Sequence, residues 1–128
     1  MFRLIKIVSA RINQAEPVKL PASAAGYTIG EALVMVGGKL TICPASEKPT
    51  YISCEEKTLA EDGCLCAYAV SPAQIFECPV QGDASALVLG DKVALSADAT
   101  AVNADASGKA TICDLAYADK GLVCVTFD

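Results

Sequence analysis

The chain has 128 residues, a length that fits one domain with a self-sufficient hydrophobic core. Its 10 basic and 15 acidic residues give a net charge of −5, which argues against nucleic acid as a partner, because binding to a phosphate backbone needs clustered Lys and Arg. Mean hydropathy is +0.42, yet the longest apolar run, residues 64–70, is far shorter than the about twenty residues of a membrane-spanning helix. We therefore expect no membrane partner.

The first residues and the apolar composition bear on localisation and assembly. Arg3 and Lys6 interrupt the apolar residues at the start, so a secretory signal is not indicated and we expect synthesis in the cytoplasm. Apolar residues make up 53% of the chain, but aromatics only 5%, and Trp is absent. A core of small and branched side chains often completes its burial against a neighbouring subunit, which favours a homo-oligomer.

Seven cysteines and no histidine limit the metal and disulfide chemistry. An odd number of cysteines without a secretory signal argues against a disulfide framework, and a thiol packs well as a small buried hydrophobe. Cys64 and Cys66 would point to one face of a strand, whereas zinc sites usually use turn spacings with a second pair of ligands. We interpret the cysteines as core residues and expect no metal.

Residues 1–21 are predicted to form an extended N-terminal arm, which ends between Pro17 and Pro21 and precedes a single β domain over residues 22–128. Two interpretations are open for this arm. It could be a strand paired within its own domain, or an extension that adds to the sheet edge of a partner through main-chain hydrogen bonds. The candidate partner-binding residues are Phe2, Arg3, Leu4, Ile5, Lys6, Ile7 and Val8.

The strands of the domain are short and separated by turn residues. Residues 30–43 predict a hairpin that turns at Gly37 and Gly38, since glycine supplies the positive φ angles of a tight two-residue turn. Further strands are expected near residues 51–54, 64–70 and 74–80, with at most one helical turn near residues 115–118. This pattern predicts a mainly β fold, a compact antiparallel barrel or sandwich with little helix.

Part of the first hairpin recurs. Residues 90–95 correspond to residues 30–35, and residues 108–113 correspond to residues 38–43 with one change. We infer two related hairpin units, about 26–78 and 86–128, which arose by duplication or use the same turn residues independently, and we expect the two hairpins to pack against each other. The second unit has ten additional residues between its glycines, which we interpret as a surface loop, because closure entropy grows slowly with loop length.

No catalytic constellation is visible. A cysteine nucleophile normally needs an adjacent base such as histidine, and the acidic pairs lie in polar turns where solvated surface is the simpler interpretation. Gly37 and Gly38 are not followed by the helix of a phosphate loop. We therefore predict a protein that is not an enzyme and has no cofactor. An alternative is a bacterial small β-barrel carrier or interaction module, with Lys120 as the candidate lysine at a turn.

The second unit resembles small capsid-decoration proteins of tailed bacteriophages, the lambda-type head-decoration family. The resemblance is carried by residues 90–95, an Ala/Asp/Ser-rich turn, residues 108–110 and the closing stretch 119–127, and residues 30–40 and 48–52 resemble related prophage structural proteins. It implies a β-rich virion protein, frequently a trimer, that binds the outside of a capsid and cross-links capsid protein subunits. It also implies that the N-terminal arm contacts the capsid, and that the protein moves from the host cytoplasm to the capsid surface.

Overall fold

The computed structural model describes residues 1–7, 17–23, 26–58 and 63–127, and the regular secondary structure of these residues is almost entirely β-strand. The elements are β1 Arg3–Ile7, β2 Pro17–Pro21, β3 Gly26–Tyr27, β4 Ala32–Val36, β5 Lys39–Ile42, β6 Tyr51–Ser53, β7 Lys57–Thr58, β8 Cys64–Ala69, β9 Gln74–Pro79, β10 Lys92–Leu95, β11 Val102–Ala104, β12 Ala110–Asp114, the 3-10 helix η1 Ala118–Lys120 and β13 Leu122–Thr126. No helix in the described part of the chain is long and apolar enough to cross a membrane.

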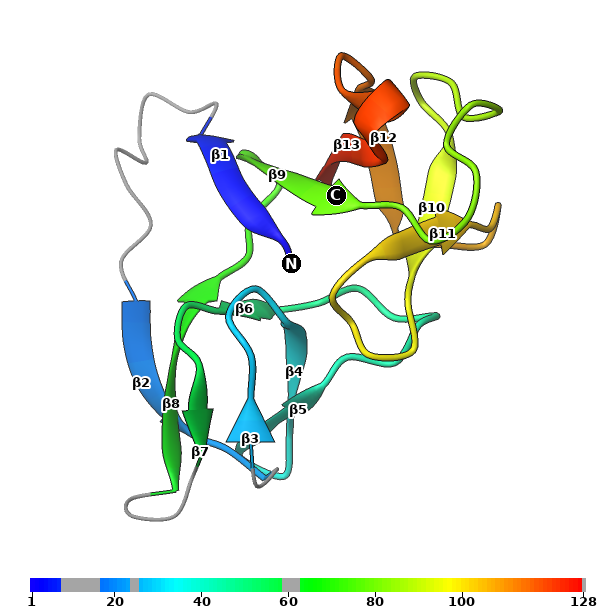
Figure 1. Ribbon diagram of the computed structural model, residues 1–128. Coiled ribbons are helices and arrows are strands. Elements are labelled where there is room, and N and C mark those ends of the chain that lie inside the picture. The colour runs from blue at the N-terminus through cyan, green and yellow to red at the C-terminus, as the bar shows by residue number, and fades with distance from the viewer. Residues whose placement is uncertain (8–16, 24–25, 59–62, 128) are drawn as a thin grey trace.

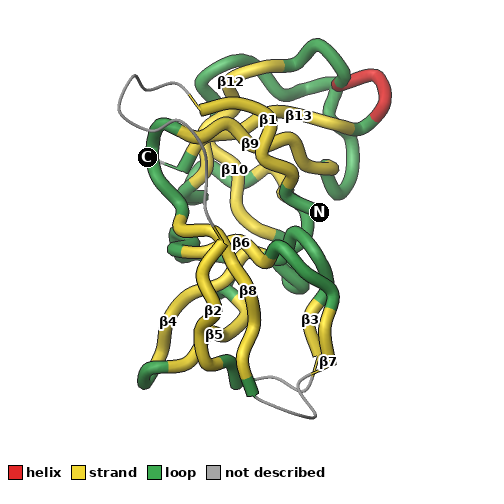
Figure 2. Tube along the Cα trace, turned by 90° about the vertical axis from the view of Figure 1, so that its left-hand side faces the viewer, coloured by secondary structure: helices red, strands yellow, loops and turns green. Residues whose placement is uncertain are grey.

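Two antiparallel sheets form the body of the protein (Figure 1). The first has the strand order β1-β9-β13-β12-β10-β11, and the second has the order β2-β8-β6-β4-β5. Strands β3 and β7 make a small separate ribbon. Figure 2 shows the two sheets one above the other, and neither closes on itself. The predicted mainly β fold is confirmed, and it is a sandwich-like arrangement rather than a barrel.

The first hairpin forms where the sequence predicts it. Strands β4 and β5 pair from Leu33 opposite Ile42 to Val36 opposite Lys39. Gly37 and Gly38 between them have φ angles of 58° and 80°. Two consecutive positive φ angles are the requirement of a type I′ turn, which matches the twist of the strands that it joins.

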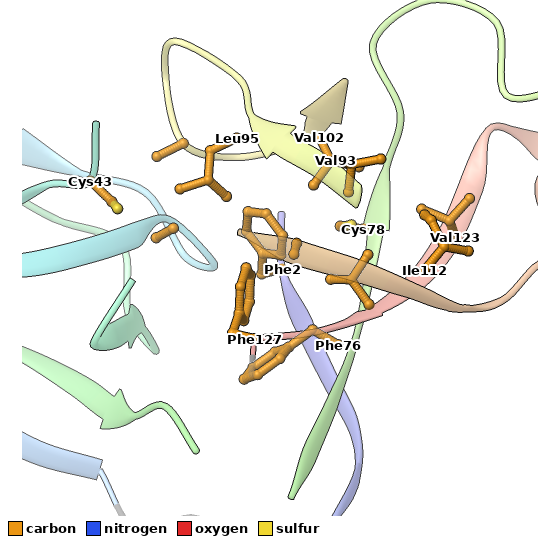
Figure 3. Close-up of a cluster of buried hydrophobic side chains, with 14 of the residues drawn as sticks. Phe2, Cys43, Phe76, Cys78, Val93, Leu95, Val102, Ile112, Val123 and Phe127 are labelled. Carbon is orange, nitrogen blue, oxygen red and sulfur yellow. The ribbon is translucent and has the colours of Figure 1, made fainter. Parts of the chain in front are cut away.

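The main core lies where the two sheets face each other. Its aromatic centre consists of all three phenylalanines of the chain, and the ring of Phe127 lies 5.5 Å from that of Phe2 and 5.7 Å from that of Phe76 (Figure 3). Phe2 and Phe127, which lie near the two ends of the chain, thus pack together with Phe76 of β9 as tilted aromatic rings. A second, smaller cluster on the other face of the five-stranded sheet is centred on Leu33, Leu40 and Leu65.

The two related hairpins lie in different sheets, and both contribute side chains to the main core. Ala32 and Val34 of β4 belong to the same buried cluster as Val93 and Leu95 of β10. Their pairing differs, however. Thr41 lies opposite Val34 in the first unit, whereas the corresponding Thr111 lies opposite Lys92, two positions earlier along the repeat.

The additional residues of the second unit are not a surface loop, so that expectation was wrong. They contain strand β11, which pairs with β10, and Val102 at its start is fully buried. The loop before β11 is buried at Ala99 and Ala101, and Ala99 belongs to the main core. The alanine-rich composition of this stretch led to the prediction of a loop. Small side chains, however, also fit the narrow space between two packed sheets.

Candidate binding surface at the first strand

Strand β1 is an edge of the six-stranded sheet. Within the described residues it pairs with β9 alone, and β2 pairs with β8 at the edge of the other sheet. Residues 3–7 and 17–21 therefore follow the first interpretation of the N-terminal segment, in which it pairs with strands of its own chain. The outer side of β1 has no described strand beside it, and an edge of this kind can accept a further strand.

The candidate residues of this segment are not equivalent. Phe2 is 3% exposed and belongs to the core, and Leu4 packs against that core from the strand. Arg3 is exposed and its guanidinium donates to the Glu77 carboxylate on β9 at 2.6 Å. Ile5 is 46% exposed.

The remaining candidates lie at the end of this strand or beyond it. Lys6 is exposed and Ile7 is half-buried. Val8 lies outside the described residues. The side chains that β1 offers to a partner are thus those of Arg3, Ile5 and Lys6, together with the strand's outer backbone edge.

A β-bulge explains why Ile5 faces solvent. Leu4 lies opposite Phe76 and Lys6 lies opposite Ile75, so that Ile5 is an extra residue with no opposite partner on β9. A bulge bends the edge strand and redirects the side chain that it carries. Bulges are also a common way to limit unspecific strand pairing at a sheet edge. The bulge therefore places an apolar side chain, that of Ile5, on the solvent-exposed edge of the sheet.

A cavity of about 230 Å³ opens beside the start of β1. It lies between the two sheets, and its lining is largely apolar. The lining residues are Met1, Phe2, Arg3, Leu4, Ile29, Ser53, Cys54 and Tyr68. The Ser53 hydroxyl already donates to the Glu55 carbonyl at 2.8 Å, and burial raises the pKa of the Cys54 thiol. The cavity therefore suits an apolar group better than proton transfer chemistry.

A larger depression of about 480 Å³ lies on the six-stranded sheet and is bordered by carboxylates. Each of these carboxylates holds its own loop: Asp83 accepts from the Ser85 amide at 2.8 Å, Asp91 from the Val88 amide at 2.9 Å, and Asp105 from the Ser107 amide at 2.9 Å. The described residues contain no group of three or more side chains arranged to hold a metal ion. We therefore interpret these carboxylates as groups that stabilise their own turns.

The thiols follow the core interpretation only in part. Cys43, Cys78 and Cys124 are buried, which confirms it for them, and burial raises the pKa of Cys43 to about 12 and that of Cys124 to about 11. Cys113 is exposed, so the interpretation was wrong there. Ile112 lies opposite Val125 and Asp114 opposite Cys124, which leaves Cys113 as the extra residue of a bulge.

Lys120, the candidate carrier lysine, is exposed at the end of η1 in the connection between β12 and β13. Its ammonium lies 5.5 Å from the centre of the Tyr117 ring, within the range of a cation–π contact. The lysine thus lies on a 3-10 turn and contacts a neighbouring ring.

Comparison with protein families, with curated proteins and with solved structures found no match. The sequence indicated the N-terminal segment but not the cavity beside it. The lining comes from four separate stretches of the chain, and only folding brings Ile29 and Tyr68 next to Phe2. The one local signal was the apolar Ile29 in a turn where a polar residue is more usual.

Proposed function

We propose that this protein is a non-enzymatic virion structural protein that decorates a phage or prophage capsid and stabilises it by cross-linking capsid protein subunits. The observation that supports this best is the outer edge of β1, which pairs with none of the described strands and has the exposed Ile5 on it and an apolar cavity at its start. A cross-linking protein needs no titrating site. It needs a strand edge for main-chain hydrogen bonds and apolar surface for affinity.

The charge of this edge defines the partner further. Lys6 is exposed on β1, whereas the Arg3 guanidinium on the same strand is paired with Glu77, and the chain as a whole carries a charge of −5. A capsid strand that bears carboxylates would therefore be attracted to this edge and repelled by much of the remaining surface. Burial of apolar surface contributes about 25 cal/mol per Å² before the costs of association are subtracted.

We propose that the protein is made in the host cytoplasm and then resides on the capsid surface as a homo-oligomer, with a trimer as the form that the resemblance implies. Exposed apolar side chains at Ile29, Val88 and Leu89 would supply contacts between copies. Light scattering of the purified protein tests this part, because a trimer has three times the mass of the chain. A stable monomer at high concentration would contradict it.

Capsid binding is tested by co-sedimentation with capsids purified from the native host. We expect Ile5→Glu to reduce binding at least about tenfold, because it removes apolar surface and adds charge at the edge. The matched control is Val36→Glu, which changes a side chain that is also exposed but lies on the hairpin of the other sheet. Equal binding by Ile5→Glu and the unaltered protein would contradict the role of β1. Deletion of the whole segment is unsuitable, since Phe2 belongs to the core.

The alternative function, a small carrier or interaction module, rests on the exposed Lys120. Intact-mass measurement of protein from the native host separates the two. A carrier would show a prosthetic group linked to Lys120 and lose it in Lys120→Arg, whereas a decoration protein would have the mass of its chain.

A further inference from the structure

Cys54 and Cys66 face each other across two neighbouring strands. Strand β6 pairs with β8 so that Ile52 lies opposite Tyr68 and Ser53 opposite Ala67. The next pair in this register is Cys54 with Cys66, and the Cys54 amide donates to the Cys66 carbonyl at 3.1 Å. The antiparallel arrangement thus continues one residue past the end of β6.

The spacing of such a pair suits a disulfide bond. Residues directly opposite in an antiparallel hydrogen-bonded pair have Cα atoms about 5.5 Å apart, and disulfides usually join Cα atoms about 4.4–6.8 Å apart. Opposite residues also point to the same face of the sheet. The side chain of Glu55 adds to the alignment, because its carboxylate accepts from the Cys66 amide at 2.9 Å and holds the segment after Cys54 against β8.

Both thiols are accessible to a small reagent. Cys54 and Cys66 are each half-buried and free, and Cys54 borders the 230 Å³ cavity beside β1. Since β6 ends at Ser53, Cys54 lies at the open end of the ladder, directly opposite Cys66. No other pair of cysteines among the described residues is opposed without a bulge between the strands.

The nearest competing pair is less suitable. Cys113 and Cys124 lie on β12 and β13, but the register there places Asp114 opposite Cys124, and Cys113 is the extra residue of the bulge. Cys124 is also buried. Cys64 shares the face of Cys66 on β8 but lies opposite Pro21. The geometry therefore favours Cys54 and Cys66 over these combinations.

We propose that Cys54 and Cys66 form a reversible disulfide by exchange with a low-molecular-weight disulfide such as oxidised glutathione. The thiolate of one cysteine attacks a glutathione sulfur, which forms a mixed disulfide and releases one glutathione thiolate. The second cysteine thiolate attacks the protein sulfur of that bond and releases the other. The protein loses two protons and two electrons, and these reduce oxidised glutathione to two molecules of glutathione.

The bond would close the segment between β6 and β8 and fix one wall of the cavity. A cross-link over a loop of this size restricts the unfolded chain, so the oxidised protein should unfold at a temperature about 5–10 °C higher. The inference concerns the thiols alone and does not depend on the proposed capsid role.

The test treats the native protein with oxidised glutathione and measures its intact mass, its cysteine linkages by peptide mapping and its Tm. We expect the mass to fall by two hydrogen atoms, a linked pair of peptides that contain Cys54 and Cys66, a higher Tm, and reversal by a reducing thiol. Cys54→Ser and Cys66→Ser should each abolish the mass change. The matched control, with Cys113→Ser and Cys124→Ser together, should keep it.

Three results would overturn the proposal. They are a mass that does not change, a mixed disulfide with glutathione that persists on Cys54 or Cys66, and a linkage that maps to other cysteines. Mapping on the unaltered protein decides among them even where a serine variant fails to fold.

Discussion

The backbone amide of Ala32 donates a hydrogen bond of 2.8 Å to the carbonyl of Ala99, and this bond joins the two sheets. Ala32 begins β4 in the five-stranded sheet, and Ala99 lies in the loop between β10 and β11 of the other sheet. Ala99 is fully buried and has a φ of 57°, a left-handed conformation that residues other than glycine seldom adopt. The contact thus depends on a small residue in a strained position.

Ala99→Val is expected to destabilise the protein by about 3 kcal/mol, because a β-branched side chain disfavours a positive φ and no space surrounds the existing methyl group. The matched control is Ala99→Gly, which relieves the backbone strain while it loses one methyl group, so the free energy of unfolding should change by less than about 1 kcal/mol. Urea denaturation followed by circular dichroism measures both. If Ala99→Val and Ala99→Gly had equal free energies of unfolding, the proposed backbone strain at residue 99 would be contradicted.

Gly108→Ala is expected to cost more than about 3 kcal/mol, because a Cβ at residue 108 would lie 2.0 Å from the Val93 carbonyl oxygen. Gly37→Ala is the control. Its φ is 58° but nothing lies within 4 Å of the added Cβ, so only the conformational cost of about 1 kcal/mol applies. Thermal unfolding of the two variants separates steric collision from backbone conformation, and similar Tm values would contradict the close approach at Gly108.

Phe2→Ala should reduce the free energy of unfolding by about 3–5 kcal/mol, since the ring is buried against Phe127. Ile5→Ala, three residues later on β1, should change it by less than about 1 kcal/mol because about half of that side chain is already in water. Chemical denaturation of both variants checks the division of the N-terminal segment into a core residue and a surface residue. An unchanged midpoint for Phe2→Ala would contradict the burial of the Phe2 ring.

Asp98 makes stability fall in acid. Hydrogen bonds from the Ser96 and Thr100 side chains, and then from the Thr100 amide, hold the pKa of Asp98 below its usual value of 3.8. Because the folded pKa is lower than the unfolded one, the stabilisation is complete above the unfolded value and is lost as the pH falls through the folded value. Tm measured from pH 6 to pH 2 should decline below about pH 4. The decline should be shallower in Asp98→Asn, and identical slopes would contradict the assignment.

Thiol labelling should separate the cysteines by exposure. With a maleimide at pH 8, Cys113 should react first because its bulge places it at the surface. Cys43 and Cys78 should remain unmodified until the protein unfolds, since burial blocks access and raises the pKa of each thiol. Time-resolved peptide mapping gives the order. Modification of Cys78 in the folded protein at the rate of Cys113 would contradict the burial.

The sequence by itself determined the local structure. Gly37 and Gly38 demanded a type I′ turn, and the flanking β-branched and leucine residues produced the strands on either side of it. The short strands and the absence of a helical period were sufficient for the mainly β fold. These features depend on neighbouring residues, so they could be inferred from the order of residue types alone.

Only the tertiary structure decided which strands share a sheet and which side chains form the cavity. Strand β9 comes at the end of the first hairpin unit, yet it lies between β1 and β13, and β11 came from a stretch that looked like a loop. The opposition of Cys54 and Cys66 likewise depends on the register of β6 and β8. Such pairings join residues far apart in sequence, and the free energy that selects them comes from burial in a common core rather than from local preference.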